Sequence, residues 1–107
     1  MTVARRFVFR APSDTEYLEL PVSLRRTFEE ILPALVRQPF RSGAGFTVGS
    51  VRRHPGLWKL KLTDFPPRTF RAIYEVDGEV VRFLGFGPRP DFYRRLRQTN
   101  RISRDRF

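Results

Sequence analysis

The residues best suited to chemistry in this sequence are cationic and lie in its second half. Lys59 and Lys61 are the only lysines in the chain, and their spacing directs both side chains to the same face of one strand. Arg71, Arg89 and Tyr93 follow downstream. In an antiparallel sheet these positions can converge on one face. There the cations would bind phosphate, and the tyrosine could stack on a base or donate a proton.

Further arginines widen this cationic set and are candidate RNA-binding residues. They are Arg52, Arg53, Arg82, Arg94, Arg95 and Arg97. The whole chain of 107 residues carries a formal net charge of +10. A charge this large on one small domain is typical of a protein that binds nucleic acid, a membrane surface or an acidic protein. The alternative interpretation is a solvated polar face on an amphipathic sheet.

Several other kinds of chemistry lack the residues they need. The chain has no cysteine, which excludes disulfides and thiolate zinc sites, and its acidic residues form no magnesium-binding pattern. His54 is the only histidine and stands beside a proline, so we interpret it as an ordinary loop residue. We therefore expect no metal and no small-molecule cofactor. With no apolar run of signal-peptide or membrane-spanning length, we expect a cytoplasmic protein that does not enter a membrane.

The first half of the chain predicts a strand and two helices. Residues 5–10 indicate a short opening strand, and Ser13 with Glu16 has the spacing of a capping box at a helix start. Pro21 is expected in the first turn of a second helix, which Pro33 should kink or restart. One apolar stripe follows helical spacing in that helix, through Leu24, Phe28, Ile31, Leu32 and Leu35.

The second half predicts a meander of strands. Residues 46–51 indicate a short strand, and residues 57–62 alternate between apolar and polar side chains. Residues 69–76 and 79–86 are apolar runs joined by Asp77-Gly78, the strongest local signal for a hairpin. Within the first of these two runs Arg71 alternates with apolar neighbours, so we expect its side chain on an exposed polar face.

Together these elements predict an α+β fold. It would contain an antiparallel sheet of about four strands, two N-terminal helices packed on one face, and a short C-terminal helix over residues 91–98. We expect one domain over residues 1–97, followed by a basic tail over residues 98–107.

Three segments in this order resemble a known family. The runs GLWKLKL, FRAIYEVDGEVVRFLGFG and RPDFYRRL are similar to the C-terminal half of the RelE/ParE superfamily of bacterial toxins. The upstream run LPVSLRRTFEEILPALVRQPF resembles the N-terminal helical hairpin of the same superfamily. The similarity covers residues 5–97, and it lies in the order and spacing of the segments.

The resemblance implies a function and a catalytic set. RelE-like members cut mRNA in the ribosomal A site, whereas ParE-like members poison DNA gyrase and lack the basic set. Lys59, Lys61, Arg71, Arg89 and Tyr93 match the basic set of the RelE-like branch. The implied protein is the toxin of a type II toxin–antitoxin system, a metal-free endoribonuclease held inactive by an acidic antitoxin.

Departures from the family pattern leave alternatives open. The spacing from Arg89 to Tyr93 is shorter than in some members, so Arg82 or Arg94 could take the place of Arg89. Some interferases of this fold use a glutamate and a histidine, but His54 lies in the wrong segment for that role. Three other functions also remain: a ParE-like gyrase inhibitor, a non-catalytic RNA- or ribosome-binding module, and a folded but inactive toxin.

Overall fold

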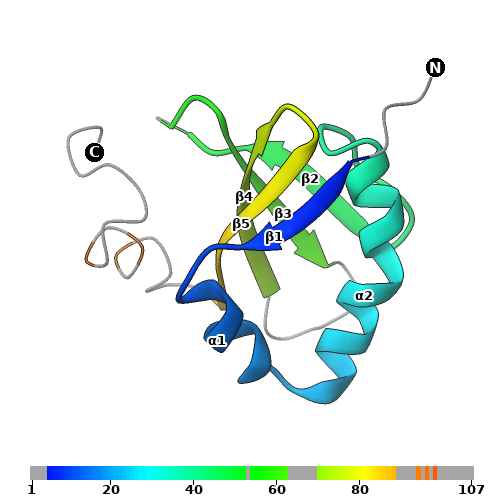
Figure 1. The fold of residues 1–107 in the computed structure, drawn as a ribbon. Coiled ribbons are helices and arrows are strands. Elements are labelled where there is room, and N and C mark those ends of the chain that lie inside the picture. The colour runs from blue at the N-terminus through cyan, green and yellow to red at the C-terminus, as the bar shows by residue number, and fades with distance from the viewer. Residues whose placement is uncertain are drawn as a thin grey trace.

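A computed structural model gives the arrangement of the chain. It describes residues 5–52, 54–62 and 70–88, together with Arg94, Leu96 and Gln98. The elements follow the order β1 (Arg6–Phe9), α1 (Ser13–Leu18), α2 (Val22–Arg37), β2 (Phe46–Ser50), β3 (Leu57–Leu62), β4 (Phe70–Asp77) and β5 (Val80–Pro88). The α+β class and the two N-terminal helices agree with the sequence prediction (Figure 1).

The strands form one mixed sheet with the order β1-β5-β4-β3-β2. Strands β2 to β5 pair as an antiparallel meander, whereas β1 runs parallel to β5 at the edge. The sheet therefore has five strands where the sequence predicted about four, and the parallel pairing of β1 with β5 makes it mixed rather than wholly antiparallel. The helices carry the chain from β1 to the far edge, and the neighbouring strands β2, β3, β4 and β5 return it so that β5 lies beside β1. The alternation of side chains within β1 does not indicate that this strand pairs with β5.

The hairpin of β4 and β5 is confirmed, although both strands begin one residue later than expected and β5 continues two residues further, to Pro88. Gly78 and Glu79 connect the strands, and Gly78 adopts a φ of 58°, which favours glycine. The register shifts once: Ile73 pairs with Gly85, but Tyr74 pairs with Phe83. The additional residue, Leu84, forms a bulge, which resets the alternation along β5.

The start of α1 differs from the predicted capping box. Pro12 is the N-cap residue, and no side chain caps the helix. The Ser13 hydroxyl lies within hydrogen-bond distance of two carbonyls, that of Arg10 before the helix and that of Phe83 on β5 at 3.1 Å. The Glu16 carboxylate accepts from the Phe86 backbone N–H at 3.3 Å. Both side chains therefore fasten α1 to β5 rather than closing its first turn.

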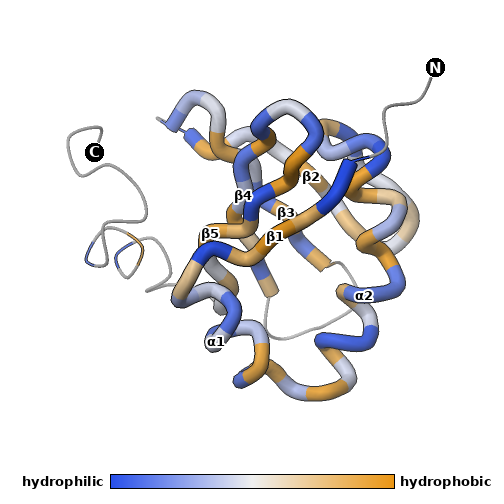
Figure 2. The backbone as a smooth tube through the Cα atoms, in the orientation of Figure 1, coloured by the Kyte–Doolittle hydropathy of each residue, from blue (hydrophilic) through white to orange (hydrophobic). Residues whose placement is uncertain are grey.

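Helix α2 is continuous through Pro33, so of the expected kink or restart, the restart does not occur. Pro33 lies on the exposed side, where water can bond the Glu29 carbonyl that lacks an N–H partner. The predicted stripe is confirmed, because Phe28, Ile31, Leu32 and Leu35 are buried and Leu24 packs against them. Figure 2 shows hydrophobic and hydrophilic segments alternating along this helix.

The main hydrophobic core lies between the helices and one face of the sheet. Both Phe83 and Phe86 enter this core, with ring centroids 5.5 Å apart, because the bulge at Leu84 brings them to the same face. Within the described part of the chain, no helix is long and apolar enough to cross a membrane.

A second, smaller apolar cluster lies on the opposite face of the sheet. It contains Val51, Ile73, Leu84 and Leu96, with Leu57 packed against it. Leu96 belongs to the expected C-terminal helix, which is helical at the three described residues Arg94, Leu96 and Gln98. The rest of that helix lies outside the described residues, and the domain boundary at residue 97 stays a prediction. The main core contains Ala72 and Tyr74 of β4, and the second cluster contains Ile73, so the centre of this strand is covered on both faces.

Candidate functional site

The strand register brings three of the predicted site residues together. Lys61 on β3 lies directly opposite Arg71 on β4, and Lys59 lies opposite Ile73. Residues directly opposite on one face have Cβ atoms about 4.5–5.5 Å apart. Alternation then places both lysines and Arg71 on the face away from α1 and α2, as a cationic row across β3 and β4.

Arg71 does not have the exposed position that the sequence predicted. Its side chain does lie on the other face of β4 from Phe70, Ala72 and Tyr74, but the residue is only 4% exposed. Alternation separates the two faces of a strand and does not tell whether the second face is covered. Here that face also carries the second apolar cluster, which includes Ile73 two residues along the same strand. The expected exposure of Arg71 was therefore wrong.

The buried guanidinium of Arg71 lacks partners. Its Nε and Nη1 atoms are buried and have no hydrogen-bond partner among the described residues. Buried polar groups are hydrogen-bonded in most proteins, and an unpaired buried charge is costly. With the ammonium group of Lys61 on the facing strand, the surroundings of Arg71 are suited to an anionic ligand.

Lys59 lies across a glycine that the sequence analysis did not single out. Gly49 on β2 pairs with Lys59, and a Cβ atom built at Gly49 would lie 3.6 Å from the Lys59 Cε. The lysine stem thus passes over β2 where no side chain stands. A glycine inside a strand marks the close approach of another group, and that signal was present in the sequence.

Arg82, a candidate RNA-binding residue, is engaged by carboxylates. Its Nη1 atom lies 2.7 Å from Glu75 Oε1, and its Nη2 atom lies 3.6 Å from Asp77 Oδ2. The hydrogen bond with Glu75 is the main reason that the pKa of Arg82 rises above its ordinary value. Arg82 shares its charge with two carboxylates, which makes it a weak substitute for Arg89.

The remaining predicted arginines fall into two groups. Arg52, in the turn after β2, and Arg94, in the C-terminal helix, are both exposed. The other predicted site residues lie outside the described part of the chain. They are Arg53, Arg89, Tyr93, Arg95 and Arg97.

His54 is a buried turn residue in this fold. It is 3% exposed, and its backbone N–H donates to the Val51 carbonyl at 3.1 Å in the connection between β2 and β3. Among the described residues, no three histidine, cysteine, aspartate or glutamate side chains gather where a metal ion could bind. The groups described at the cationic row can stabilise negative charge through lysine and arginine, and lysine can also transfer a proton.

The described architecture, two helices on one face of a five-stranded mixed sheet, defines a known α+β class. It is similar to the structure of the E. coli toxin RelE, solved in the free state as a mutant with two arginines replaced by alanine. The TM-score is 0.61 at 23% sequence identity, over 78% of this chain and 82% of the RelE chain. No protein-family model and no curated protein matches the sequence. The chain thus has a RelE-like fold.

Proposed function

We propose that this chain is the toxin of a type II toxin–antitoxin pair and cleaves mRNA in the ribosomal A site without a metal ion. The RelE-like fold supports the toxin class. The cationic row supports an RNA substrate, because it offers ammonium and guanidinium groups together. The net charge of +10 supports both an RNA substrate and an acidic antitoxin as the inhibitory partner in the cytoplasm.

The observation that carries this proposal is the buried, unpartnered guanidinium of Arg71. It is 4% exposed, and two of its nitrogens lack a partner among the described residues. Folding gains nothing from burying such a charge, so the arrangement is better explained by a ligand. A phosphate group supplies oxygens that match the guanidinium fork and the charge of Lys61.

The proposed reaction is an attack within the RNA strand. The 2′-hydroxyl oxygen bonds to the adjacent phosphorus, and the bond from that phosphorus to the 5′-oxygen breaks. Lys59 or Lys61 takes the hydroxyl proton or stabilises the charge on the attacking oxygen, and Arg71 stabilises the pentavalent transition state. The family resemblance adds Arg89 as a second phosphate ligand and Tyr93 as the group that stacks on the base or protonates the leaving oxygen. The ribosome positions the mRNA.

Induced expression in a bacterial host tests this function. Mapping of mRNA 5′ ends should show new cuts within codons for the native chain and for Arg26→Ala, which alters an exposed residue of α2. Arg71→Ala should remove the cuts. Assays of DNA supercoiling provide the contrasting readout, because a ParE-like inhibitor would poison gyrase and leave mRNA intact. Growth arrest with intact mRNA would overturn the proposed ribonuclease function.

A further inference from the structure

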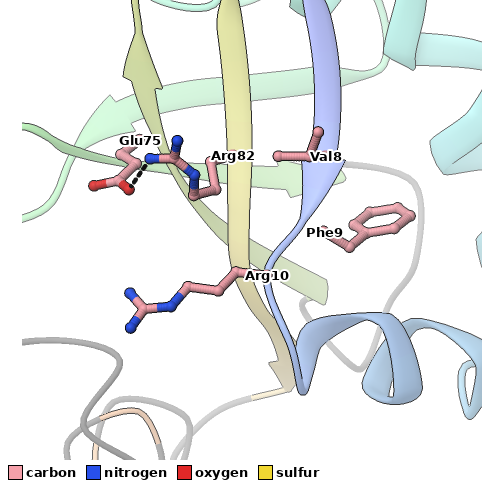
Figure 3. Close-up of a pocket in the computed structure, with 5 residues that line it drawn as sticks. All are labelled: Val8, Phe9, Arg10, Glu75 and Arg82. Carbon is pink, nitrogen blue, oxygen red and sulfur yellow. Dashed lines mark hydrogen bonds and ion pairs between the residues drawn. The ribbon is translucent and has the colours of Figure 1, made fainter.

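A pocket on the same side of the sheet as the cationic row has an unusual combination of groups. It has a volume of about 460 Å³ and is lined by Val8, Phe9, Arg10, Glu75 and Arg82. Figure 3 shows Val8, Arg10 and Arg82 pointing away from the side to which Phe9 points, which is the side of α1. The pocket is largely open to solvent, so a ligand would lie on the sheet surface rather than in a closed cavity.

Arg82 holds the carboxylate of Glu75 in place, and this carboxylate can still accept further hydrogen bonds. Its Oε1 atom accepts from Arg82 Nη1 at 2.7 Å, and the two side chains are about equally exposed, at 34% and 33%. A carboxylate has two oxygens with about four acceptor positions. Oε2 and part of Oε1 therefore remain open to hydrogen-bond donors from a ligand.

The other walls complement this carboxylate. The guanidinium of Arg10 is exposed and makes no hydrogen bond or ion pair with the described residues. Val8, which is 39% exposed, adds an apolar surface on which a flat ring can lie. The pocket thus combines fixed acceptors, available donors and an apolar wall.

These groups fit a nucleobase better than a phosphate. A phosphate beside Arg82 would lie against Glu75 and meet its negative charge. A base presents donors and acceptors on its edges, and single-stranded RNA is recognised through those edges.

Guanine is the base whose hydrogen-bonding edges match the carboxylate and arginine groups of this pocket. Its N1–H and N2 amino group are adjacent donors, which suit the two oxygens of one carboxylate. Its O6 and N7 are acceptors that suit an arginine fork. Adenine and cytosine each place a ring acceptor beside their amino group, and that acceptor would face a carboxylate oxygen. Uracil has one donor between two acceptors.

The pocket also lies next to the cationic row. Glu75 pairs with Leu57 on β3, so it is the diagonal neighbour of Lys59, which pairs with Ile73. Diagonal neighbours on one face are about 7–8 Å apart. A phosphate bound by the lysines would leave the base of a neighbouring nucleotide within reach of Glu75.

We propose that Glu75, positioned by Arg82 and assisted by Arg10, binds the guanine base of a nucleotide that flanks the cleaved phosphate. This inference rests on the proposed RNA cleavage for its biological role. The binding of guanine itself can be measured without cleavage.

The first test is an NMR titration of the full chain with guanosine, inosine and adenosine 5′-monophosphates at millimolar concentration. We expect saturable shifts at Val8, Arg10 and Glu75. Guanosine monophosphate should bind about tenfold or more tightly than the adenosine compound, because a paired contact to a base edge is lost. The inosine compound lacks the N2 amino group and should be intermediate.

Matched variants complete the test. Glu75→Gln keeps the shape of the side chain but presents an amide N–H₂ in place of one acceptor, so the preference for guanine should disappear. Asp77→Asn removes one negative charge near the same arginine but outside the pocket, so the preference should remain. The proposal is overturned if no monophosphate binds, if guanosine and adenosine monophosphates bind equally, or if Glu75→Gln keeps the native preference.

Cleavage supplies the second readout. The cut sites of the native chain should be enriched in guanine at one fixed position, and Glu75→Gln should still cut but lose that enrichment. Cutting with an unchanged base preference in Glu75→Gln would overturn the pocket and leave the ribonuclease standing. Guanine-selective binding without any mRNA cutting would support the pocket and overturn the ribonuclease.

Discussion

The charge of Arg71 has different effects on the stability of the fold and on the proposed binding of phosphate. Its guanidinium is buried at 4% exposure with two unpartnered nitrogens. Replacing a buried charge by an apolar side chain of similar volume is often neutral or stabilising. A phosphate site, by contrast, depends on that charge. These two effects of one substitution can be measured separately.

The Arg71→Met variant is expected to lose activity and keep its fold. Its free energy of unfolding should stay the same or rise by about 1 kcal/mol, because no buried partner is lost. Its ribosome-programmed mRNA cleavage should fall by about 100- to 1,000-fold, because the transition state loses an electrostatic donor. Urea unfolding and single-turnover cleavage give the two values.

Arg71→Lys is the matched control and should restore cleavage only in part, because a point charge does not replace the fork. A loss of more than about 2 kcal/mol in Arg71→Met would instead place the guanidinium in a structural network. The site would then have to rest on Lys59 and Lys61.

At the scale of elements, α1 is fastened to the sheet by side chains that resemble a helix cap in sequence. Ser13 is fully buried and donates to the carbonyl of Phe83 on β5. Ser13→Ala should lower the free energy of unfolding by about 1 kcal/mol, because a buried hydrogen bond between α1 and β5 is lost while the Phe83 carbonyl keeps the Arg10 N–H as a donor at 2.9 Å. Thermal and urea unfolding provide the measurement, and RNA cleavage should not change.

Thr27→Ala in α2 is the comparison for Ser13. The Thr27 hydroxyl donates to the Ser23 carbonyl at 3.1 Å in an exposed position, so its removal should change stability by less than about 0.5 kcal/mol. Equal effects of the two substitutions would show that the bond from α1 to β5 adds no stability.

The contact between α1 and α2 should respond to alkaline pH. Burial, followed by the carboxylate of Glu29, raises the pKa of Tyr17 from 10.0 to about 12. Below pH 10 the tyrosine is protonated in both the folded and the unfolded chain. Between pH 10 and 12 only the unfolded chain releases the proton, so the free energy of unfolding should decrease across that range.

Urea unfolding across this pH range measures the effect. The chain has only two lysines and arginine stays protonated, so few other groups titrate there. Burial also raises the pKa of Tyr74, which adds a decrease in the same direction. Tyr17→Phe should make the decrease shallower. An identical decrease in that variant would contradict the assignment to Tyr17.

At the scale of the whole molecule, charge should govern RNA affinity. The net charge of +10 implies that binding to single-stranded RNA releases counterions. With three to five phosphate contacts, the logarithm of the binding constant should fall with the logarithm of salt concentration at a slope of about −2 to −3.5. Fluorescence anisotropy of a labelled RNA measures this slope.

Two variants refine the salt measurement. Lys61→Met should reduce the slope by about 0.7, the value of one phosphate contact, whereas Arg26→Ala should leave it unchanged. A slope near zero in the native chain would mean that RNA binding does not depend on the cationic face.

The sequence by itself determined which side chains share a face. The alternation in β3 separates the lysines from Trp58, Leu60 and Leu62, and the helical period of α2 gathers its apolar stripe. It also determined the hairpin at Gly78. Each of these features depends on residues a few positions apart, because pleat and helical turn are local properties of the backbone.

Only the tertiary structure decided what covers each face and which distant groups meet. Leu96 packs in the apolar cluster on the face that carries Arg71, and β1 pairs with β5 from the other end of the chain. The meeting of Arg10 with Glu75 and Arg82 follows from that strand pairing. Such contacts join residues far apart in sequence, and no local period encodes them, because they depend on how the packed elements close over one another.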